Sequence, residues 1–355
     1  MRVKIGDVTK IRTGKLDANA SSEEGQYPFF TCSREPLRIS TYSYDCECVL
    51  VAGNGDLNVK YYNGKFDAYQ RTYIIEDNSG GKLYMPYLYY FMEGYIEELR
   101  KQAIGGVIKY IKLGNLTNAL IELPSIHKQR AIVDILEKIR NVIAMRNAEV
   151  NKLENLVRTR FVELFGDMFL NTMSWNEEPL EEMANVVSGI TKGRKLKAQC
   201  TTEVPYMAVS NVKDGYIDWT TVKTIEATEQ EINQYRLLPE DVLMTEGGDP
   251  DKLGRGAIIK GPLENCIHQN HIFRVRLNAT VILPEFFAEY LRHQKSKRYF
   301  LGCAKQTTGI ASINMRQLKA LPVLLPPLEL QNQFADFVKV VDKSKFTKTF
   351  RPLRC

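Results

Sequence analysis

The sequence predicts an α+β fold built from two similar modules, each followed by a helix. Three features of the 355 residues support this prediction. Short runs of β-prone residues alternate with helical patterns along most of the chain. Motifs of the first half return in the same order in the second half. An uninterrupted helical stripe of apolar residues separates the two halves.

The repeated motifs define the two modules. Each module is expected to start with a short amphipathic turn and a β-prone run that ends at Gly14 or Gly189. Further along, an apolar strand runs into a Gly-rich turn closed by Asp56 or Asp249. Shared propensities of two unrelated α+β domains are the alternative to a true repeat. The paired segments are 4–14 with 179–189, 27–33 with 204–211, 48–56 with 241–249, 85–91 with 283–291, and 121–129 with 323–331.

A long helix is predicted between the modules. No Pro or Gly interrupts Ser125–Phe165, and Gly166 supplies a C-terminal stop. About 41 residues at ~1.5 Å each give a rod of roughly 60 Å, whose apolar stripe needs a partner. The natural partner is a helix at Leu328–Phe346, which Pro352 prevents from continuing. The residues expected to pack between these helices are Ile132, Ile135, Ile139, Ile143, Val150, Leu153, Val157, Phe161, Leu164, Phe334, Phe337, Val338 and Val341.

The predicted second helix is much shorter than the first. We therefore expect weaker pairing near Val150–Leu164, where no partner from the same chain would reach. The predicted division of the chain is a first module at 1–124, a helix at 125–166, a second module at 167–322 and a truncated helix at 323–355.

The composition is that of an ordinary globular chain. Hydrophobic residues make up 44% and charged residues 25%, and 48 basic against 42 acidic residues leave a net charge of +6. This weakly basic balance favours an anionic partner. The sequence has no run of ~18 apolar residues, so we expect no membrane span, and we expect no export signal at the N-terminus. The seven scattered cysteines are therefore expected to be reduced thiols in a cytoplasmic protein.

No catalytic or cofactor motif stands out. The chain lacks a Gly-x-Ser-x-Gly nucleophile turn, a Gly-x-x-x-x-Gly-Lys phosphate loop and the Asn/Asp-Pro-Pro-Tyr/Phe motif of amino-methyltransferases. Cys266, His268 and His271 are metal-binding residue types, but they lead into a strand on which the two histidines face opposite ways. We expect no catalytic site, no metal and no cofactor.

Nucleic-acid binding has diffuse support from three basic clusters. They are Lys192–Lys197, Lys295–Phe300 and Lys60–Lys65, the last predicted as a hairpin with an Asn-Gly turn. Lys and Arg contact phosphates, and Arg, Asn and Gln read base edges in the major groove. A solvated surface without function is the alternative for each cluster.

The order of these motifs resembles the DNA-specificity subunit of type I restriction-modification systems. The resemblance is carried by 123–167, by Leu325–Gln331, and by Gly309-Ile310 with its first-half counterpart Gly106–Ile108. It implies two target-recognition domains that each read one half of a split DNA sequence, and helices that pack antiparallel as a coiled-coil spacer. It also implies double-stranded DNA, methyltransferase (modification) subunits and a motor-nuclease (restriction) subunit as partners. It implies no catalytic role of the chain itself, and the lack of a long apolar run leads us to expect no membrane partner.

The short second helix departs from this family pattern, which has two helices of similar length. An alternative function follows, in which the chain is a helical protein-interaction scaffold with impaired or lost DNA recognition. In the DNA-recognition function, the rod sets the gap between the half-sites, and two divergent modules imply an asymmetric site.

Candidate DNA contacts are the polar or basic residues near predicted turns. In the first module they are Arg34, Asn54, Lys60, Tyr61, Tyr62, Lys65 and Arg71. In the second module they are Lys192, Arg194, Lys195, Asn211, Lys213, Lys252, Arg255, Gln269, Lys305 and Gln306.

Overall fold

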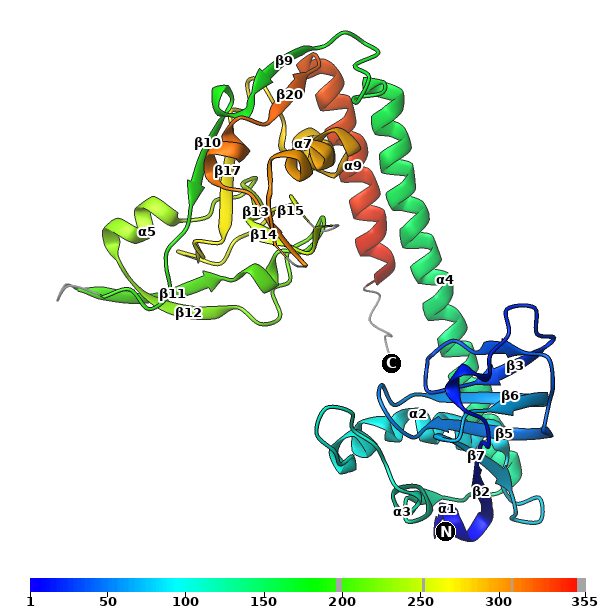
Figure 1. Ribbon diagram of the computed structural model, residues 1–355. Helices are drawn as coiled ribbons and strands as arrows, with labels where there is room; N and C mark the ends of the chain where they lie inside the picture. The colour runs from blue at the N-terminus through cyan, green and yellow to red at the C-terminus, as the bar shows by residue number, and fades with distance from the viewer. Residues whose placement is uncertain (196–199, 251–252, 308, 350–355) are drawn as a thin grey trace. The chain divides into compact units, whose positions relative to one another are not determined.

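The computed structural model describes residues 1–195, 200–250, 253–307 and 309–349. The chain divides into two compact units, Met1–Arg146 and Asn147–Cys355 (Figure 1). The division falls inside one continuous helix, α4 (Ile126–Phe165), which ends at the predicted Gly166, where φ is 73°. Within the described ranges, no helix is both long and apolar enough to cross a membrane.

Unit 1 is built around a mixed sheet. Its strands lie in the order β2-β7-β5-β6-β3-β4, with β3 and β6 parallel and the other neighbours antiparallel. A separate antiparallel pair joins β1 to β8. The strands are β1 (Arg2–Lys4), β2 (Thr9–Thr13), β3 (Tyr27–Phe30), β4 (Leu37–Ile39), β5 (Tyr44–Ala52), β6 (Val59–Ala68), β7 (Thr72–Asp77) and β8 (Leu120–Glu122). The helices are α1 (Ile5–Val8), η1 (Ala18–Ala20), α2 (Met85–Gln102), α3 (Leu113–Thr117) and the first part of α4.

Both faces of this sheet are covered by apolar side chains. Along β5, Val49 and Val51 belong to the same buried cluster as Leu88 of α2, as the two-residue period of a strand requires. The alternate residues Cys48 and Leu50 belong to a second cluster on the opposite face. The sheet is therefore held by two cores, of which one is closed by α2.

The predicted hairpin at Lys60–Lys65 is wrong. β6 runs through Asn63-Gly64, which pairs with Glu47 and Cys46 of β5 in a continuous antiparallel ladder. Gly64 has a φ of 135°, a conformation that suits glycine, yet the chain does not reverse there. The ladder outweighs the turn tendency of Asn-Gly because β6 is anchored in the cores on both sides, by Val59 and Phe66.

Unit 2 has smaller sheets and more helices. Its strands pair in the orders β10-β17-β13-β15, β12-β11-β16, β14-β19-β18 and β20-β9. The strands are β9 (Asn176–Pro179), β10 (Ala184–Ser188), β11 (Thr201–Met207), β12 (Lys223–Thr228), β13 (Val242–Thr245), β14 (Gly247–Gly248), β15 (Gly256–Ile258), β16 (Ile267–His268), β17 (Ile272–Leu277), β18 (Lys305–Thr307), β19 (Ile310–Ser312) and β20 (Pro322–Leu325). The helices are η2 (Leu180–Glu182), η3 (Val209–Asn211), α5 (Glu229–Tyr235), α6 (Pro284–Arg292), α7 (Gln294–Cys303), α8 (Met315–Lys319) and α9 (Leu328–Thr349).

The predicted repeats fall on matching elements, which confirms the two-module plan. β2 and β10 each pair with the strand β7 or β17, and β5 and β13 pair with the same strands from the other side. α2 and α6 each have a proline in their first turn. β8 and β20 each precede the helix that closes the module, α4 or α9.

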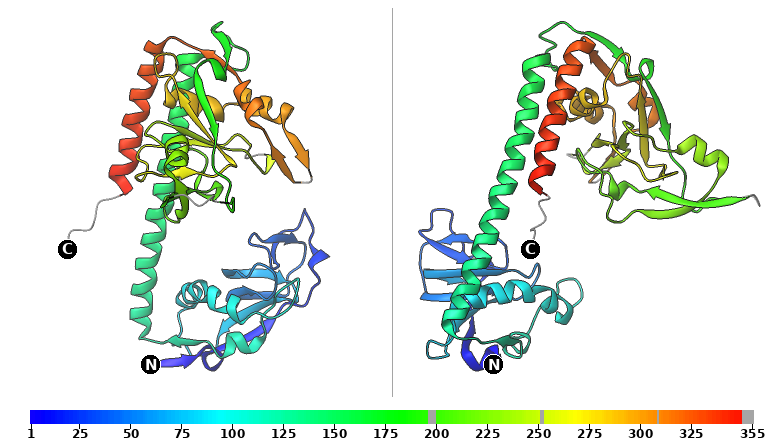
Figure 2. Two further views of the ribbon diagram at one scale, coloured as in Figure 1. Left: turned by 90° about the vertical axis from the view of Figure 1, so that its left-hand side faces the viewer. Right: turned by 180° about the vertical axis from the view of Figure 1, so that it is seen from behind.

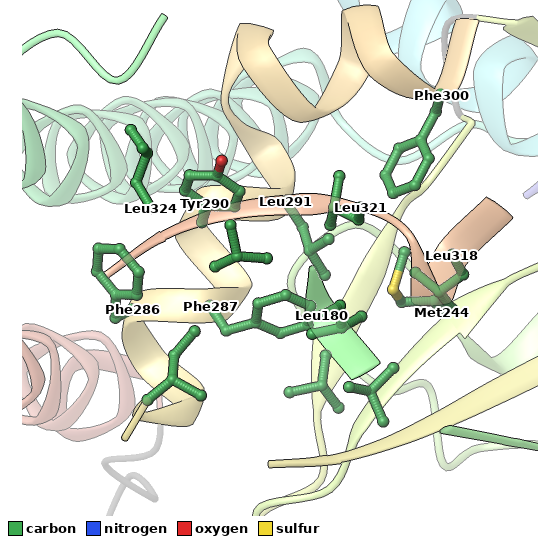
Figure 3. Packing of buried hydrophobic residues seen from close by; sticks show 14 of the residues in the cluster. Leu180, Met244, Phe286, Phe287, Tyr290, Leu291, Phe300, Leu318, Leu321 and Leu324 are labelled. Carbon is green, nitrogen blue, oxygen red and sulfur yellow. The ribbon is translucent and has the colours of Figure 1, made fainter. Parts of the chain in front are cut away.

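The largest core of unit 2 surrounds α6. Phe286, Phe287 and Tyr290 of this helix are buried, and Tyr290 donates a hydrogen bond to the Pro322 carbonyl (2.7 Å). Figure 3 shows these rings among apolar side chains from other helices and from strands of the unit. The labelled partners are Leu180, Met244, Leu291, Phe300, Leu318, Leu321 and Leu324.

α9 lies beside the last turns of α4 in this unit and runs in the opposite direction (Figures 1 and 2). The ring of Phe161 lies 5.3 Å from that of Phe334 and 5.4 Å from that of Phe286. Val157 and Val341 belong to the same core. α9 also continues past the predicted end at Phe346, to Thr349.

The expectation of weak pairing at Val150–Leu164 is therefore wrong. An antiparallel second helix meets the first at its C-terminal end, so the shortness of α9 leaves an earlier part of α4 uncovered. Ile135, Ile139 and Ile143 are 57%, 51% and 55% exposed, which contradicts their predicted packing. Val150 is also exposed, and Val133 is buried next to a half-buried Ile132. Leu153, Leu164, Phe337 and Val338 are partly buried and pack against this core.

Candidate nucleic-acid interface

Unit 1 has a polar cleft at the ends of its central strands. The turn Tyr69–Arg71, which connects β6 to β7, forms one wall, and the ends of β2 and β5 form the others. A Cβ atom at Gly14 would lie 2.1 Å from the Ala68 carbonyl oxygen, and one at Gly53 would lie 2.4 Å from the Arg71 carbonyl oxygen. Only glycine permits these approaches. The cleft measures about 470 Å³ and is lined by Thr13, Gly14, Lys15, Gly53, Gln70, Arg71, Tyr73 and Ile111.

The side chains of this cleft are available for a ligand. Lys15, Gln70 and Arg71 are exposed, and within the described part of the chain their side chains make no ion pair or hydrogen bond. The lining residues include two cations and no carboxylate. The cleft therefore suits a ligand rich in hydrogen-bond acceptors or negative charge.

The turn Gln269–His271 of unit 2 has the same backbone frame as Tyr69–Arg71. Both turns are held by equivalent N–H to carbonyl hydrogen bonds from their own residues and from the neighbouring strand end. In unit 1, the N–H groups donate from Tyr69 to Phe30 (2.9 Å), from Gln70 to Leu16 (2.9 Å), from Thr72 to Tyr69 (2.8 Å) and from Gly53 to Arg71 (2.7 Å). In unit 2, the corresponding N–H groups donate, in the same order, from Gln269 to Met207 (3.0 Å), from Asn270 to Ile190 (3.0 Å), from Ile272 to Gln269 (2.9 Å) and from Glu246 to His271 (3.0 Å).

The side chains on this common frame differ between the units. His271 takes the place of Arg71, and Glu246 takes the place of Gly53. His271 Nδ1 lies 2.6 Å from Glu246 Oε2, and 57% of the His271 side chain is exposed. Asn270 lies beside them, with its Nδ2 3.4 Å from His271 Nε2. The second turn therefore presents the donor groups of Asn270 and His271 beside the carboxylate of Glu246. The first turn presents the guanidinium of Arg71 instead.

Among the first-module candidates, Arg71 lines the cleft and Asn54 lies next to it. Asn54 follows Gly53 and forms an isolated β-bridge with Tyr110. Arg34 is held by an ion pair with Asp56 (3.0 Å). Asp56 also binds Arg100 (3.0 Å), and hydrogen bonds from the two guanidinium groups lower the pKa of the Asp56 carboxyl group.

The other four first-module candidates lie along β6 and do not line the cleft. Tyr62 packs against Phe30, with ring centroids 5.1 Å apart, so it contributes to the core. Tyr61 donates a hydrogen bond to Glu47 (2.7 Å), and Lys60 donates one to Asn58. Lys65 lies over the ring of Tyr42, 4.7 Å from its centroid.

Two second-module candidates have structural roles instead. Asn211 is 1% exposed, its Oδ1 accepts a hydrogen bond from the Ala208 N–H (2.9 Å), and its Nδ2 donates to the Asp218 carbonyl (2.9 Å). Arg194 binds both carboxylate oxygens of Glu231 (2.6 and 2.7 Å). The structure therefore leaves neither side chain free for DNA, and we withdraw both as candidates.

The remaining second-module candidates do not lie together. Gln269 opens the turn described above, although its Oε1 accepts a hydrogen bond from the Val209 N–H (3.3 Å). Lys305 and Gln306 are exposed on β18, whose partner β19 pairs with Gly247 directly after Glu246. Lys192 and Lys195 are exposed and Lys213 is half-buried, while Arg255 lines a cleft of about 300 Å³ together with Arg292 and Lys297. Lys252 lies outside the described residues.

Sequence reasoning did not name Lys15, Gln70, Asn270, His271 or Glu246 as DNA contacts, and it considered His271 only as a metal-binding residue type. Their only local signal is the neighbouring glycines and the position of each turn just before an apolar strand. The residues come together because strands far apart in the sequence end at the same edge of the sheet.

A metal centre has no support in the described part of the chain, where no cluster of three or more His, Cys, Asp or Glu residues could hold an ion. His268 is fully buried, and its ring nitrogens face the carbonyl oxygens of Tyr235 (3.1 Å) and Val187 (3.3 Å). Burial lowers the pKa of His268 to about 4. His271 is committed to Glu246 instead.

Comparison with known proteins places the chain in a family. Residues 1–155 and 173–350 match the family described as "Type I restriction modification DNA specificity domain", so the chain belongs to this family. This confirms the class that the repeated motifs predicted, a DNA-specificity chain of a type I system.

Curated relatives of the chain are named as specificity subunits of type I restriction enzymes. The chain is 36% identical over 156 residues to the type I restriction enzyme EcoDI specificity subunit of Escherichia coli. This matched region covers 44% of this chain and 34% of that protein. It is 30% identical over 192 residues to the putative MjaX specificity subunit of Methanocaldococcus jannaschii, with 54% and 43% covered. The matched region thus spans less than half of either relative. The MjaVIII specificity subunit of the same organism is 24% identical over 377 residues, with 96% and 85% covered.

Solved structures share the fold. The type I restriction-modification S subunit from M. genitalium superposes with a TM-score of 0.60 at 17% identity, covering 98% of this chain and 90% of that one. A second solved chain comes from a structure that describes complex assembly and conformational transition of the type I R-M system. It superposes with a TM-score of 0.51 at 16% identity, covering 98% of this chain and 92% of that one.

Proposed function

We propose that this chain recognises a bipartite, asymmetric DNA sequence and directs a type I methyltransferase and restriction complex to it. Module 1–124 reads one half-site and module 167–322 reads the other. The chain itself contributes recognition and no catalysis. The observation that carries this proposal is the occurrence of one backbone frame in both units with different polar side chains on it.

The helices at 125–166 and 323–355 serve as the spacer in this proposal. Support comes from the continuous α4 and from the antiparallel contact of its last turns with α9, centred on Phe161 and Phe334. A helical spacer of fixed length fixes the number of unread base pairs between the half-sites, as dimer spacing does in other DNA-binding proteins.

Methyltransferase subunits pack on the uncovered stripe of α4, which comprises Ile135, Ile139, Val142 and Ile143. These four residues are at least half exposed. The opposite side of α4 is occupied within unit 1, where Val133 is buried and Arg140 binds Glu93 of α2. An exposed apolar stripe of this kind is typical of a protein interface.

The stripe is tested by co-purification with the cognate methyltransferase subunit. Ile139→Lys and Ile143→Lys should reduce recovery of the complex at least tenfold. Asn141→Lys adds the same charge at an exposed position of the helix outside the stripe, and it should leave recovery unchanged. Equal recovery with all three variants would remove the stripe from the proposal.

The function is tested by mapping methylated bases in cells that carry the chain and this methyltransferase subunit. We expect a new split motif with two unequal halves, absent from cells with the methyltransferase subunit alone. If the two proteins co-purify and no new motif is modified, the scaffold alternative replaces DNA recognition.

A further inference from the structure

We propose that the turns Tyr69–Arg71 and Gln269–His271 read bases, one turn for each half-site. The assignment rests on the proposed function and adds to it the side chains that set specificity. Family membership says nothing about which residues do this. The starting point is that two turns with one frame differ in the side chains they present.

The backbone of each turn is fixed, as base reading requires. In the first turn, the N–H groups of Tyr69 and Gln70 donate to the carbonyls of Phe30 and Leu16. The Arg71 carbonyl accepts from Gly53, and the next residue, Thr72, is 1% exposed. Side chains that leave a rigid backbone keep the position that hydrogen bonding to a base edge needs.

The side chains of the first turn match purine edges. Arg71 has a planar fork of donors that fits O6 and N7 of guanine, and Gln70 has the donor and acceptor that fit N6 and N7 of adenine. Lys15 adds a third donor-bearing side chain, and no carboxylate lines the cleft. The first turn therefore selects a guanine through Arg71 and an adenine through Gln70.

The side chains of the second turn select differently. Asn270 fits adenine, and the Glu246 carboxylate accepts a hydrogen bond from the N4 amino group of cytosine. Glu246 is one-third exposed and is oriented by His271. Glu246 lies at the end of β13, beside the second turn, and its first-unit counterpart is Gly53, so the first turn has no such acceptor beside it. Two unequal half-sites follow from this difference.

The test is selection of bound duplexes from a pool with randomised positions, using the full-length chain. Arg71→Ala should lower the base preference at one position of one half-site by about 5- to 100-fold and leave the other half-site unchanged. Asn270→Ala should do the reverse. Lys82→Ala removes an exposed cation of unit 1 that does not line the cleft, and it should change neither half-site.

Two results would overturn the assignment. If Arg71→Ala and Asn270→Ala select the same motif as the unaltered chain, the turns do not read bases. If each variant weakens all sequences equally and lowers the salt dependence of binding, the side chains contact phosphates instead. A failure of the proposed function looks different, because the unaltered chain would then select no motif at all.

Discussion

Gln129 and Gln331 make the same three hydrogen bonds in the two units. Each accepts a bond from the N–H of the residue before a helix, Tyr84 or Leu283 (2.8 Å in both). Each amide nitrogen also donates to two backbone carbonyls, those of Lys82 (2.8 Å) and Pro124 (2.9 Å) for Gln129, and of Val281 (3.1 Å) and Pro326 (2.8 Å) for Gln331. Both residues are fully buried. The start of each closing helix is thereby fastened to its module.

Replacing either glutamine should destabilise its unit. Gln129→Ala or Gln331→Ala leaves one buried N–H and two carbonyl groups without partners, so we expect a loss of about 2–4 kcal/mol. Urea unfolding followed by circular dichroism measures it. The exposed Asn141→Ala is the matched control and should change stability by less than about 0.5 kcal/mol. A loss no larger than that of the control would show that these bonds do not hold the helices.

Phe161 should be the most sensitive position of α4. It is 2% exposed, and its ring contacts those of Phe165, Phe286 and Phe334. Phe161→Ala removes a buried ring and should cost about 3–5 kcal/mol in thermal or urea unfolding. Ile139→Ala, at a half-exposed position of the same helix, should cost less than about 1 kcal/mol. Similar losses at both positions would contradict the antiparallel contact with α9.

Arg194 should matter for stability and not for DNA. Its hydrogen bonds lower the pKa of Glu231 to about 2. A carboxyl group with a lowered folded pKa adds stability above its ordinary pKa of about 4.5, and this contribution is lost as pH falls towards 2. Arg194→Ala should therefore remove part of the stability at neutral pH and leave DNA affinity and its salt dependence unchanged. A lower salt dependence in binding titrations would restore Arg194 as a DNA contact.

His268 should make unit 2 sensitive to mild acid. Burial lowers its pKa from 6.5 to about 4, so the unfolded chain takes up a proton before the folded chain does. Stability is complete above about pH 6.5 and falls as pH drops towards 4, by about 3 kcal/mol at most for this group. Unfolding midpoints measured between pH 7 and 4 should show a smaller fall for His268→Gln than for the unaltered chain. Parallel curves would assign the acid sensitivity to other groups.

The sequence could predict the periodic parts of this fold. The three-and-four spacing and Gly166 located α4. The paired motifs located one matching strand each at four places, namely β2 and β10, β3 and β11, β5 and β13, and β8 and β20. Periodicity identifies an apolar face and does not identify what covers it. For this reason Ile139 and Phe161 looked equivalent, although one is half exposed and the other is buried.

The site residues depend on long-range contacts that the sequence does not display. Arg194 follows a glycine turn like a surface cation, but its partner Glu231 is far along the chain. Asn211 is a polar turn residue whose amide is used inside the unit. Lys15 and Gln70 meet in a cleft only because strand ends converge at one sheet edge.

The most direct test of the two-module account is the base preference of the unaltered, purified chain, measured at every position of a randomised duplex pool. The account predicts two blocks of preferred bases, different in sequence and separated by positions without preference. A single continuous block, two identical blocks or no preference would contradict it.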